Sequence, residues 1–165
     1  MKPGQTGRRQ ETTAENDKYM ITKEQKEQAA GLLFTEKCSC VIRNGDTVRI
    51  FRQRGVADLY RLLREEPHLL QGAFIADKVV GKGAAALMVL GGVAGLFADV
   101  VSRPALELLA GAGIAVEYTV AVPNIVNRAG TGICPVEQLC ERAETAAECL
   151  PLIDGFMRKI KQQHG

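Results

Sequence analysis

The residues best suited to chemistry form one block, from Asn127 to Glu137 (NRAGTGICPVE). Two glycines in this block allow successive backbone N–H groups to converge on an anion. Cys134 takes the N-cap position of an expected helix, Pro135 the first helical position and Glu137 the third. Free N–H groups at a helix start bind anions and lower the pKa of a thiol. The block therefore fits a phosphate-binding loop, a reactive cysteine or a structural turn.

A catalytic Cys134 would need a base, and the chain has two histidines. His68 follows an expected helix end, and His164 lies next to the C-terminus. Ligand binding or helix capping therefore fits this block better than catalysis by Cys134. Three further polar side chains are expected to contact a ligand: Asn127, Arg128 and Thr131.

A second candidate is Asp77-Lys-Val-Val-Gly-Lys82, at an expected junction between a strand and a helix. Open α/β sheets bind ligands at such junctions. Lys78 and Lys82 are spaced to share one face of the first helical turns, where two cations oppose the helix dipole. We expect a bound anion to compensate them, with Asp77, Lys78 and Lys82 contacting the ligand. The alternative is an N-cap aspartate with two solvated lysines. The segment is not a P-loop, because glycine follows the second lysine.

The next helix that flanks the sheet is expected to start at Ser102-Arg103-Pro104. Ser102 is a good N-cap residue, and Arg103 is placed to reach an anion at the same sheet edge. The alternative for Arg103 is an exposed surface role. Both residues join the candidate ligand-binding set.

Hydrophobic periodicity and turn residues predict the elements that position these side chains. Expected helices start at the capping box Thr22-Lys-Glu-Gln25, at residues 56, 78 and 102, after the 127–137 block, and at the capping box Thr145-Ala-Ala-Glu148. Expected strands cover residues 38–42, 47–51, 73–76, 95–100 and 114–122, the first two joined by Asn44-Gly45 as a hairpin.

This order predicts an α/β fold, a three-layer α/β/α sandwich whose mixed sheet carries an N-terminal hairpin at its edge. Residues 1–18 are polar and are expected to form a disordered tail. Residues 19–165 are expected to form a single domain, a usual size for one hydrophobic core.

Composition excludes several classes of function. A formal net charge of +2 and the lack of a Lys/Arg stripe with aromatics argue against nucleic-acid binding. The longest apolar stretch, residues 83–101, is broken by glycines and an aspartate, so no membrane span is expected. Five cysteines without a secretory signal indicate a reducing, cytoplasmic setting with free thiols. Cys38 and Cys40 are expected to share one strand face, but no second pair accompanies them at metal-ligand spacing, so neither a metal nor a cofactor is expected.

Several of these motifs resemble an uncharacterised prokaryotic family, catalogued as domain of unknown function 1893. The resemblance covers roughly residues 35–143 and rests on Asp-Lys-Val-Val-Gly-Lys, on Ser102 with the helix after it, and above all on Asn-Arg-x-Gly-Thr-Gly-x-Cys-Pro-x-Glu. It implies a cytidine deaminase-like fold and no established activity.

True deaminases bring a His- or Cys-x-Glu motif at one helix start and Pro-Cys-x-x-Cys at the next, to hold zinc and a proton-shuttling glutamate. The corresponding helix starts here are Asp77-Lys78 and Ser102-Arg103-Pro104, which offer neither a thiol nor an imidazole. We therefore expect a zinc-free protein whose pocket suits phosphate or ribose.

Three hypotheses follow. The first is a zinc-free deaminase-fold protein that binds a nucleotide-like or other anionic small molecule. The second is a cysteine-dependent enzyme that uses Cys134, with Asp77 or Glu137 assisting. The third is a non-catalytic regulatory or assembly protein, since deaminase-like folds often form homo-oligomers. The first is the main prediction, with a homo-oligomer expected.

Overall fold

The computed structural model describes residues 21–53 and 55–164. The predicted tail at residues 1–18 lies outside the described residues. The elements follow in the order α2 (Lys23–Thr35), β1 (Cys40–Asn44), β2 (Thr47–Phe51), α3 (Ala57–Glu65), α4 (Pro67–Leu70), β3 (Phe74–Val80), α5 (Lys82–Gly91), β4 (Gly95–Ser102), α6 (Arg103–Gly111), β5 (Ala115–Val122), α7 (Pro135–Leu139) and α8 (Ala146–His164).

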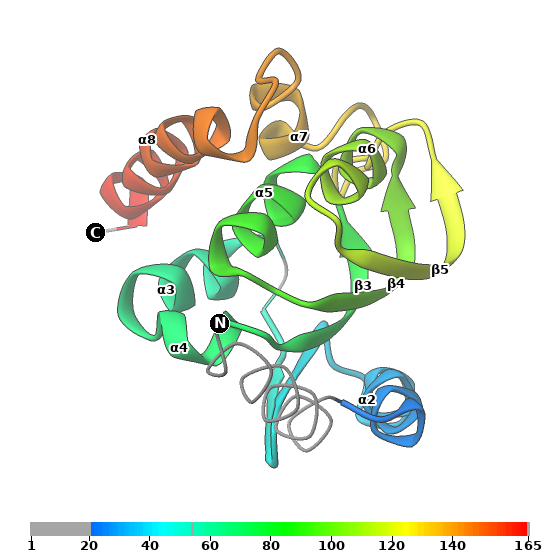
Figure 1. Cartoon of the computed structure of the whole chain (residues 1–165). Coiled ribbons are helices and arrows are strands. Elements are labelled where there is room, and N and C mark those ends of the chain that lie inside the picture. The colour runs from blue at the N-terminus through cyan, green and yellow to red at the C-terminus, as the bar shows by residue number, and fades with distance from the viewer. Residues whose placement is uncertain (1–20, 54, 165) are drawn as a thin grey trace, which may run out of the picture.

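A five-stranded mixed sheet organises the described part of the chain, in the order β2-β1-β3-β4-β5. The hairpin β1–β2 is antiparallel, and β1 also pairs antiparallel with β3. Strands β3, β4 and β5 are parallel, and α5 and α6 form the crossovers between them (Figure 1). The predicted mixed α/β sheet with an antiparallel hairpin at its edge is confirmed.

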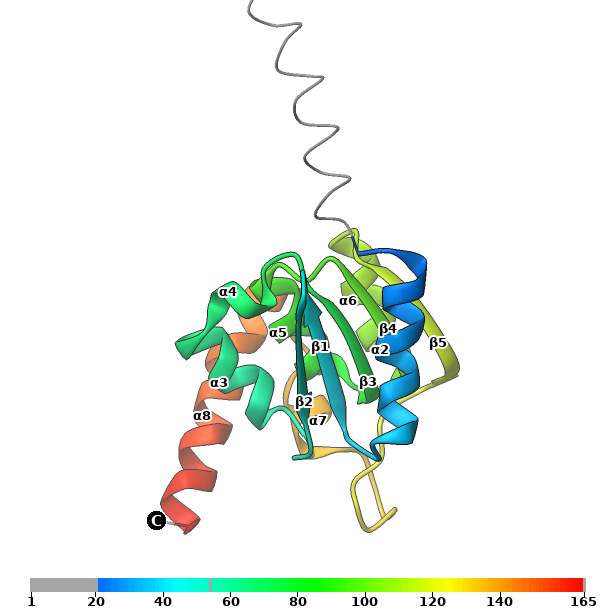
Figure 2. The same cartoon turned by 90° about the horizontal axis from the view of Figure 1, so that it is seen from below.

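Helices cover both faces of the sheet. Helix α2 packs on one face, over β1 and β3, and α5 and α6 pack on the other (Figure 2). Helices α3 and α8 add an outer layer against α5. The two faces bury separate apolar clusters, and Cys38 and Cys40 divide between them. The prediction that these two cysteines share one strand face is wrong, because β1 starts only at Cys40.

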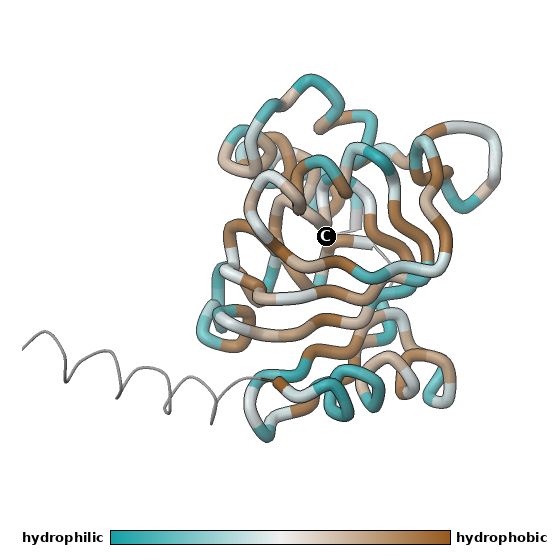
Figure 3. The backbone as a smooth tube through the Cα atoms, turned by 45° about the vertical axis from the view of Figure 1, so that its right-hand side comes forward, coloured by the Kyte–Doolittle hydropathy of each residue, from teal (hydrophilic) through white to brown (hydrophobic). Residues whose placement is uncertain are grey.

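Hydrophobic residues follow the central strands, while hydrophilic residues gather in the connecting turns (Figure 3). Helix α5 is buried almost all round, in keeping with its Gly/Ala-rich sequence. Close packing explains its glycines. A Cβ added at Gly91 would lie 2.8 Å from Leu70 Cδ1, closer than real Cβ contacts allow. The small residues of this helix therefore serve tight packing, the alternative to ligand approach.

The junction between β3 and α5 differs from the sequence prediction. Strand β3 continues through Val80, and α5 starts at Lys82 with Gly81 as its N-cap. The β-branched pair Val79 and Val80 extends the strand by pairing with Val100 and Val101 of β4. Asp77 is consequently a strand residue and caps no helix, and Lys78 and Lys82 do not share a helical face.

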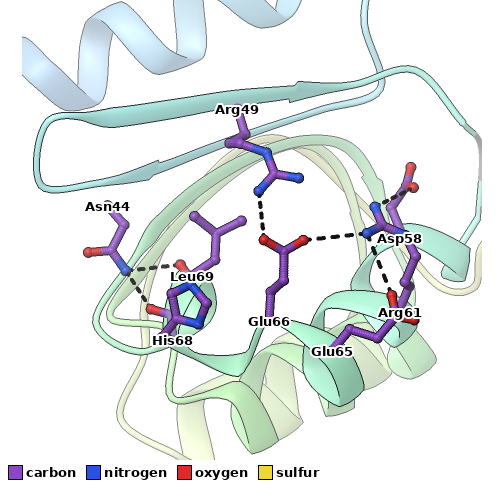
Figure 4. A network of polar contacts seen from close by, with 8 residues as sticks. All are labelled: Asn44, Arg49, Asp58, Arg61, Glu65, Glu66, His68 and Leu69. Atoms are coloured by element: carbon purple, nitrogen blue, oxygen red, sulfur yellow. Dashed lines mark hydrogen bonds and ion pairs between the residues drawn. The ribbon is translucent and has the colours of Figure 1, made fainter.

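A polar network fixes the short helix α4, which the sequence did not predict, against the hairpin (Figure 4). The side-chain amide of Asn44 donates to the carbonyls of His68 (3.2 Å), Leu69 (2.9 Å) and Gln71 (2.9 Å). Arg49 pairs with Glu66 at 3.1 Å, and this hydrogen bond holds the pKa of Glu66 below its usual value. Asn44, expected only as a turn residue, thus also satisfies carbonyls at the end of α4.

Within residues 21–53 and 55–164, none of the helices combines the length and the apolar character that crossing a bilayer requires.

Candidate functional site

The carboxyl ends of β3 and β4 and the starts of α5 and α6 form the sheet edge where the sequence places a ligand. Ser102 ends β4 and caps α6, accepting the N–H of Ala105 at 3.2 Å, as predicted. Its side chain is fully buried. Arg103, the next residue, is exposed. At this sheet edge the Ser102 hydroxyl is therefore buried, and Arg103 is exposed to solvent.

Glu137 occupies this edge. Its carboxylate is 2 % exposed and accepts hydrogen bonds from the backbone N–H of Lys82 (3.0 Å), the hydroxyl of Ser102 and the backbone N–H of Ile125. Two of these donors sit at the starts of α5 and α6, where the helix dipoles stabilise negative charge. The anion expected between the two motifs is therefore supplied by the chain itself.

Lys82 is also used internally. Its ammonium group donates to the carbonyls of Glu141 (3.1 Å) and Ala143 (2.5 Å), in the turn between α7 and α8, and the residue is 9 % exposed. Lys78 lies on β3 and is half-buried. The two lysines therefore do not act as a pair. Lys82 fixes the α7–α8 turn and helps to close the sheet edge.

The loop after β5 is a small hairpin that satisfies its own polar groups. Val126 bridges Ile133. The side chain of Asn127 accepts the N–H of Thr131 at 3.0 Å and donates to its hydroxyl at 3.1 Å. The N–H of Gly130, a residue with positive φ, donates to the Asn127 carbonyl. Asn127 thus shapes the turn, while Arg128 and Thr131 remain exposed at its tip.

Cys134 stands at the N-cap of α7, as predicted, with Pro135 at the first helical position. Its side chain makes no capping hydrogen bond. His68 belongs to α4, and α4 lies at the opposite end of the sheet from α7, whose N-cap is Cys134 (Figures 1 and 2). The nearer histidine in sequence, His164, ends α8. The structure therefore does not bring His68 to Cys134 as a base.

Among the carboxyl groups of the candidate site, that of Asp77 has the most strongly shifted pKa. Burial raises its pKa to about 7, against the smaller effect of hydrogen bonds from the backbone of Val79 and Lys78. It pairs across the sheet with Cys40, whose pKa is raised by burial and by the neighbouring Asp77. A carboxyl that holds its proton near neutral pH can donate a hydrogen bond or transfer a proton.

The volume between α5 and α7 is closed by apolar packing. A Cβ built on Gly83 would lie 2.3 Å from Val136 Cγ1 and 3.7 Å from Val56 Cγ1. Val136 is 8 % exposed. The short helix α7 therefore rests directly on the first turn of α5, and side chains fill the place where a ligand would enter from this side.

We expect Gly83→Ala to destabilise the fold by about 2 kcal/mol, because the added methyl overpacks against the stiff Val136 side chain. In the double variant Gly83→Ala/Val136→Ala, the cost of the first change should largely disappear, since the second removes the opposing methyl groups. Urea unfolding of all four proteins measures this coupling. If the losses of stability in the two single variants simply add up in the double variant, the close contact between Gly83 and Val136 is contradicted.

A shallow groove of about 550 Å³ lies elsewhere, between α3 and α8. Its apolar lining includes Tyr60, Met157 and Ile160. Tyr60 donates its hydroxyl hydrogen to Asp154, and this hydrogen bond raises the pKa of Tyr60. Arg64 pairs with Asp154 at 3.3 Å. The groove thus joins an aromatic ring on α3 to a carboxylate on α8.

The charged lining of this groove is mainly basic. Three cations, Arg64, Arg158 and Lys161, face one carboxylate, Asp154. Arg158 and Lys161 take part in no ion pair with the residues that the structure describes. The groove continues along α3 past Gln53 and Arg61, where Asp58 and Glu65 add two carboxylates to the lining. It offers two free cations beside an apolar wall.

Sequence reasoning missed this groove. Tyr60 and Arg64 are one turn apart on α3, which indicates a shared helix face. Arg158 and Lys161 have the same relation on α8, three residues apart. Each pair alone reads as an ordinary exposed helix surface, and only the contact between the two helices joins them. No three His, Cys, Asp or Glu side chains gather as metal ligands in the part of the chain that the structure describes.

Comparisons with known proteins place the chain in a family. The profile of a domain of unknown function, DUF1893, matches residues 28–157. A crystal structure of a DUF1893 family protein from Thermotoga maritima resembles this fold, with a TM-score of 0.76 and 23 % sequence identity over 83 % of this chain and 92 % of that one. None of the curated proteins matches. The chain is therefore a member of the DUF1893 family.

Proposed function

We propose that the protein binds an anionic, nucleotide-like small molecule in the groove between α3 and α8. The observation that carries this proposal is the pairing of two free cations, Arg158 and Lys161, with the ring of Tyr60 along one groove. Phosphate oxygens would pair with the cations, and a base or another flat ring would pack on Tyr60 and Met157. The ligand class is the one expected from the sequence, and its place is new.

The sheet edge supports this relocation. Its strongest anion-binding groups, the start of α5 and the Ser102 hydroxyl, already hold Glu137. An incoming anion would have to displace a buried carboxylate with three donors, which costs several hydrogen bonds to a charged group. In the α3–α8 groove the Asp154 carboxylate holds Tyr60 and Arg64, whereas Arg158 and Lys161 form no ion pair with the residues that the structure describes.

We propose further that the fold is cytidine deaminase-like and works without zinc. The strand order β2-β1-β3-β4-β5, with three parallel strands and helices at β3 and β4, supports this assignment. At the two helix starts where deaminases hold zinc, this chain has Gly81-Lys82 and Ser102-Arg103. Neither pair offers a zinc ligand of the deaminase type. Free thiols at all five cysteines support a cytoplasmic setting.

Thermal unfolding with inorganic phosphate, ribose 5-phosphate and AMP tests the binding proposal. We expect AMP at about ten times its dissociation constant to raise Tm by about 4 °C. The variant Arg158→Ala/Lys161→Ala should lose this shift, because both groove cations are gone. Tyr60→Leu should lose the preference for AMP over inorganic phosphate.

Lys159→Ala is the matched control, since Lys159 is exposed on the same helix and does not line the groove. It should keep the full shift. Equal shifts in the double variant and in wild type would move the site elsewhere. If none of inorganic phosphate, ribose 5-phosphate and AMP changes the Tm of the wild-type protein, the binding proposal is wrong.

The free edge of β5 favours the assembly hypothesis as a second candidate. Within the described residues, β5 pairs only with β4, and Tyr118 and Val120 are each 47 % exposed. Its eight residues contain neither proline nor lysine, which commonly protect edge strands. A second copy could add its own β5 and extend the sheet.

We expect light scattering at about 100 µM to show a dimer that Val120→Lys converts to a monomer, because a charge on the edge strand opposes strand pairing. Val48→Lys is the matched control on β2, the other edge strand, and should stay dimeric; Val48 is 39 % exposed. A monomeric wild type at this concentration would exclude assembly through β5.

A further inference from the structure

One half of the sheet face that carries α2 is uncovered in the part of the chain that the structure describes. Helix α2 contacts β1 and β3, and β5 lies beside it (Figure 2). On the opposite face, α6 packs against both β4 and β5. Parallel strands normally have both faces buried under other elements. The α2 side of β4 and β5 therefore has the character of a surface that another layer covers.

A row of valines occupies this uncovered half. Val79, Val100 and Val120 are direct cross-strand neighbours on β3, β4 and β5. The residue that follows each valine packs in or against the apolar cluster on the α5–α6 face. Because successive strand residues point to opposite faces, the three valines point to the α2 face. Val79 is 44 % exposed and Val120 is 47 % exposed, and the row belongs to neither core cluster.

Phe34, near the end of α2, extends this row. The residue is 50 % exposed, and its ring meets that of Phe97 on β4 edge-on, with 6.4 Å between the ring centroids. Phe97 points to the α2 face, because it packs against the cluster under that helix. Phe34, Phe97 and the three valines form one apolar surface, the valine face. Exposed apolar surfaces of this kind mark interaction sites on soluble proteins.

Gly31 indicates independently that another surface approaches α2 from outside. Glycine weakens the interior of a helix. Gly31 is exposed, and a Cβ built on it has no atom within 4 Å. Ala29 and Leu33, two positions away on either side, are the buried residues of α2, so Gly31 points away from its own sheet. Packing within the described domain does not require this glycine, whereas a second surface laid close against α2 explains it.

We propose that a second copy of this chain covers the valine face, related to the first by a two-fold axis that runs along the strands. Helix α2 raises one half of the face, and the other half, over β5, is flat. Rotation about this axis sets α2 of each copy on β5 of the other, as an isologous contact requires. Helix α2 runs in the same direction as the strands, from the start of β3 to Phe97 of β4. The axis keeps the two ends level, so Phe34 of one copy packs on Val120 of the other.

Charges at the rim of the valine face favour this orientation. Lys37 lies just after α2, and Glu117 lies on β5, level with Phe97. Both side chains are exposed, and neither forms an ion pair with the residues that the structure describes. The rotation brings Lys37 of each copy to the β5 side of the other, beside Glu117, which gives two symmetric ion pairs. The contact uses the face of the sheet and leaves the backbone edge of β5 free, so it is distinct from edge-to-edge assembly.

Sedimentation velocity of the full chain tests this contact. At about 100 µM we expect wild type to be a dimer, and Val79→Asp should raise the dissociation constant at least about tenfold, because the contact would bury an unpaired carboxylate. Val79 lies on an interior strand, so this change leaves the β5 edge intact. Leu152→Asp is the matched control and should stay dimeric, since Leu152 is 37 % exposed on α8, away from the valine face.

Gly31→Gln is the second variant, and it does not depend on how well a strand tolerates a charge. Glutamine favours a helix more than glycine does, so the dissociated protein should have a higher Tm. Its side chain should hold α2 away from the other copy and weaken the dimer about tenfold. A wild-type dimer that Val79→Asp and Gly31→Gln both leave intact overturns the face contact, and its separation by Val120→Lys would place the contact at the β5 edge. A monomeric wild type also overturns it, and a dimer gained by deleting residues 1–20 would then identify those residues as the occupant.

Discussion

Replacing Glu137 with alanine is expected to destabilise the folded protein by about 4 kcal/mol, because three donors lose their acceptor inside the molecule. The backbone N–H groups of Lys82 and Ile125 and the hydroxyl of Ser102 all point to this carboxylate. Each unsatisfied buried donor costs about 1–3 kcal/mol, and a water in the vacated space offsets part of the sum. Urea unfolding followed by circular dichroism measures the change.

Three variants identify the cause. Glu141→Ala removes the same charge from an exposed position one turn later and should cost less than about 0.5 kcal/mol. Glu137→Gln should destabilise the fold by an intermediate amount. Its amide oxygen still accepts some of the hydrogen bonds, whereas its NH2 group faces a remaining donor and cannot accept from it. Ser102→Ala combined with Glu137→Ala should cost less than the two single changes together. A loss in Glu137→Ala no larger than in Glu141→Ala would exclude the carboxylate as a structural hub.

Local patterns predicted most elements of this fold, since short periods report directly on which face is buried. The apolar and β-branched runs of β4 and β5, the hairpin at Asn44-Gly45 and the Ser102 cap all follow from neighbouring residues. The prediction failed at residues 77–81. There an aspartate followed by a lysine resembles a helix start, but pairing of Val79 and Val80 with β4 carries the strand past it. The stabilisation that comes from pairing with a strand about twenty residues away cannot be predicted from the local pattern.

The site was harder to predict than the fold, for the same reason. Glu137 was correctly placed at the third position of a helix, where a local rule turns its side chain back to the N-cap. Its carboxylate instead bonds Lys82, 55 residues earlier. Likewise, the groove joins α3 to α8 through Tyr60 and Asp154, which are 94 residues apart. Residue types and spacing identified the anion-binding donors but not the acceptor that they hold.

The stability of the protein should fall as pH rises from about 4 to about 7, and Asp77→Asn should remove much of this fall. Burial raises the pKa of Asp77 to about 7, well above its usual value of 3.8. Below the lower value both folded and unfolded chains hold the proton. Between the two values the unfolded chain releases it and the folded chain does not, so unfolding becomes more favourable; above the higher value the loss is complete.

Asparagine imitates the protonated carboxyl and keeps an oxygen for the N–H of Val79, which donates to Asp77 at 3.3 Å. Asp77→Asn should therefore match wild type near pH 4 and exceed it at pH 8 by on the order of 3 kcal/mol. Urea unfolding at several pH values gives the difference. Asp46→Asn, in the exposed hairpin turn, is the control for the change of charge alone. If Asp77→Asn and wild type keep a constant difference in the free energy of unfolding from pH 4 to pH 8, Asp77 does not hold its proton near neutral pH in the folded state.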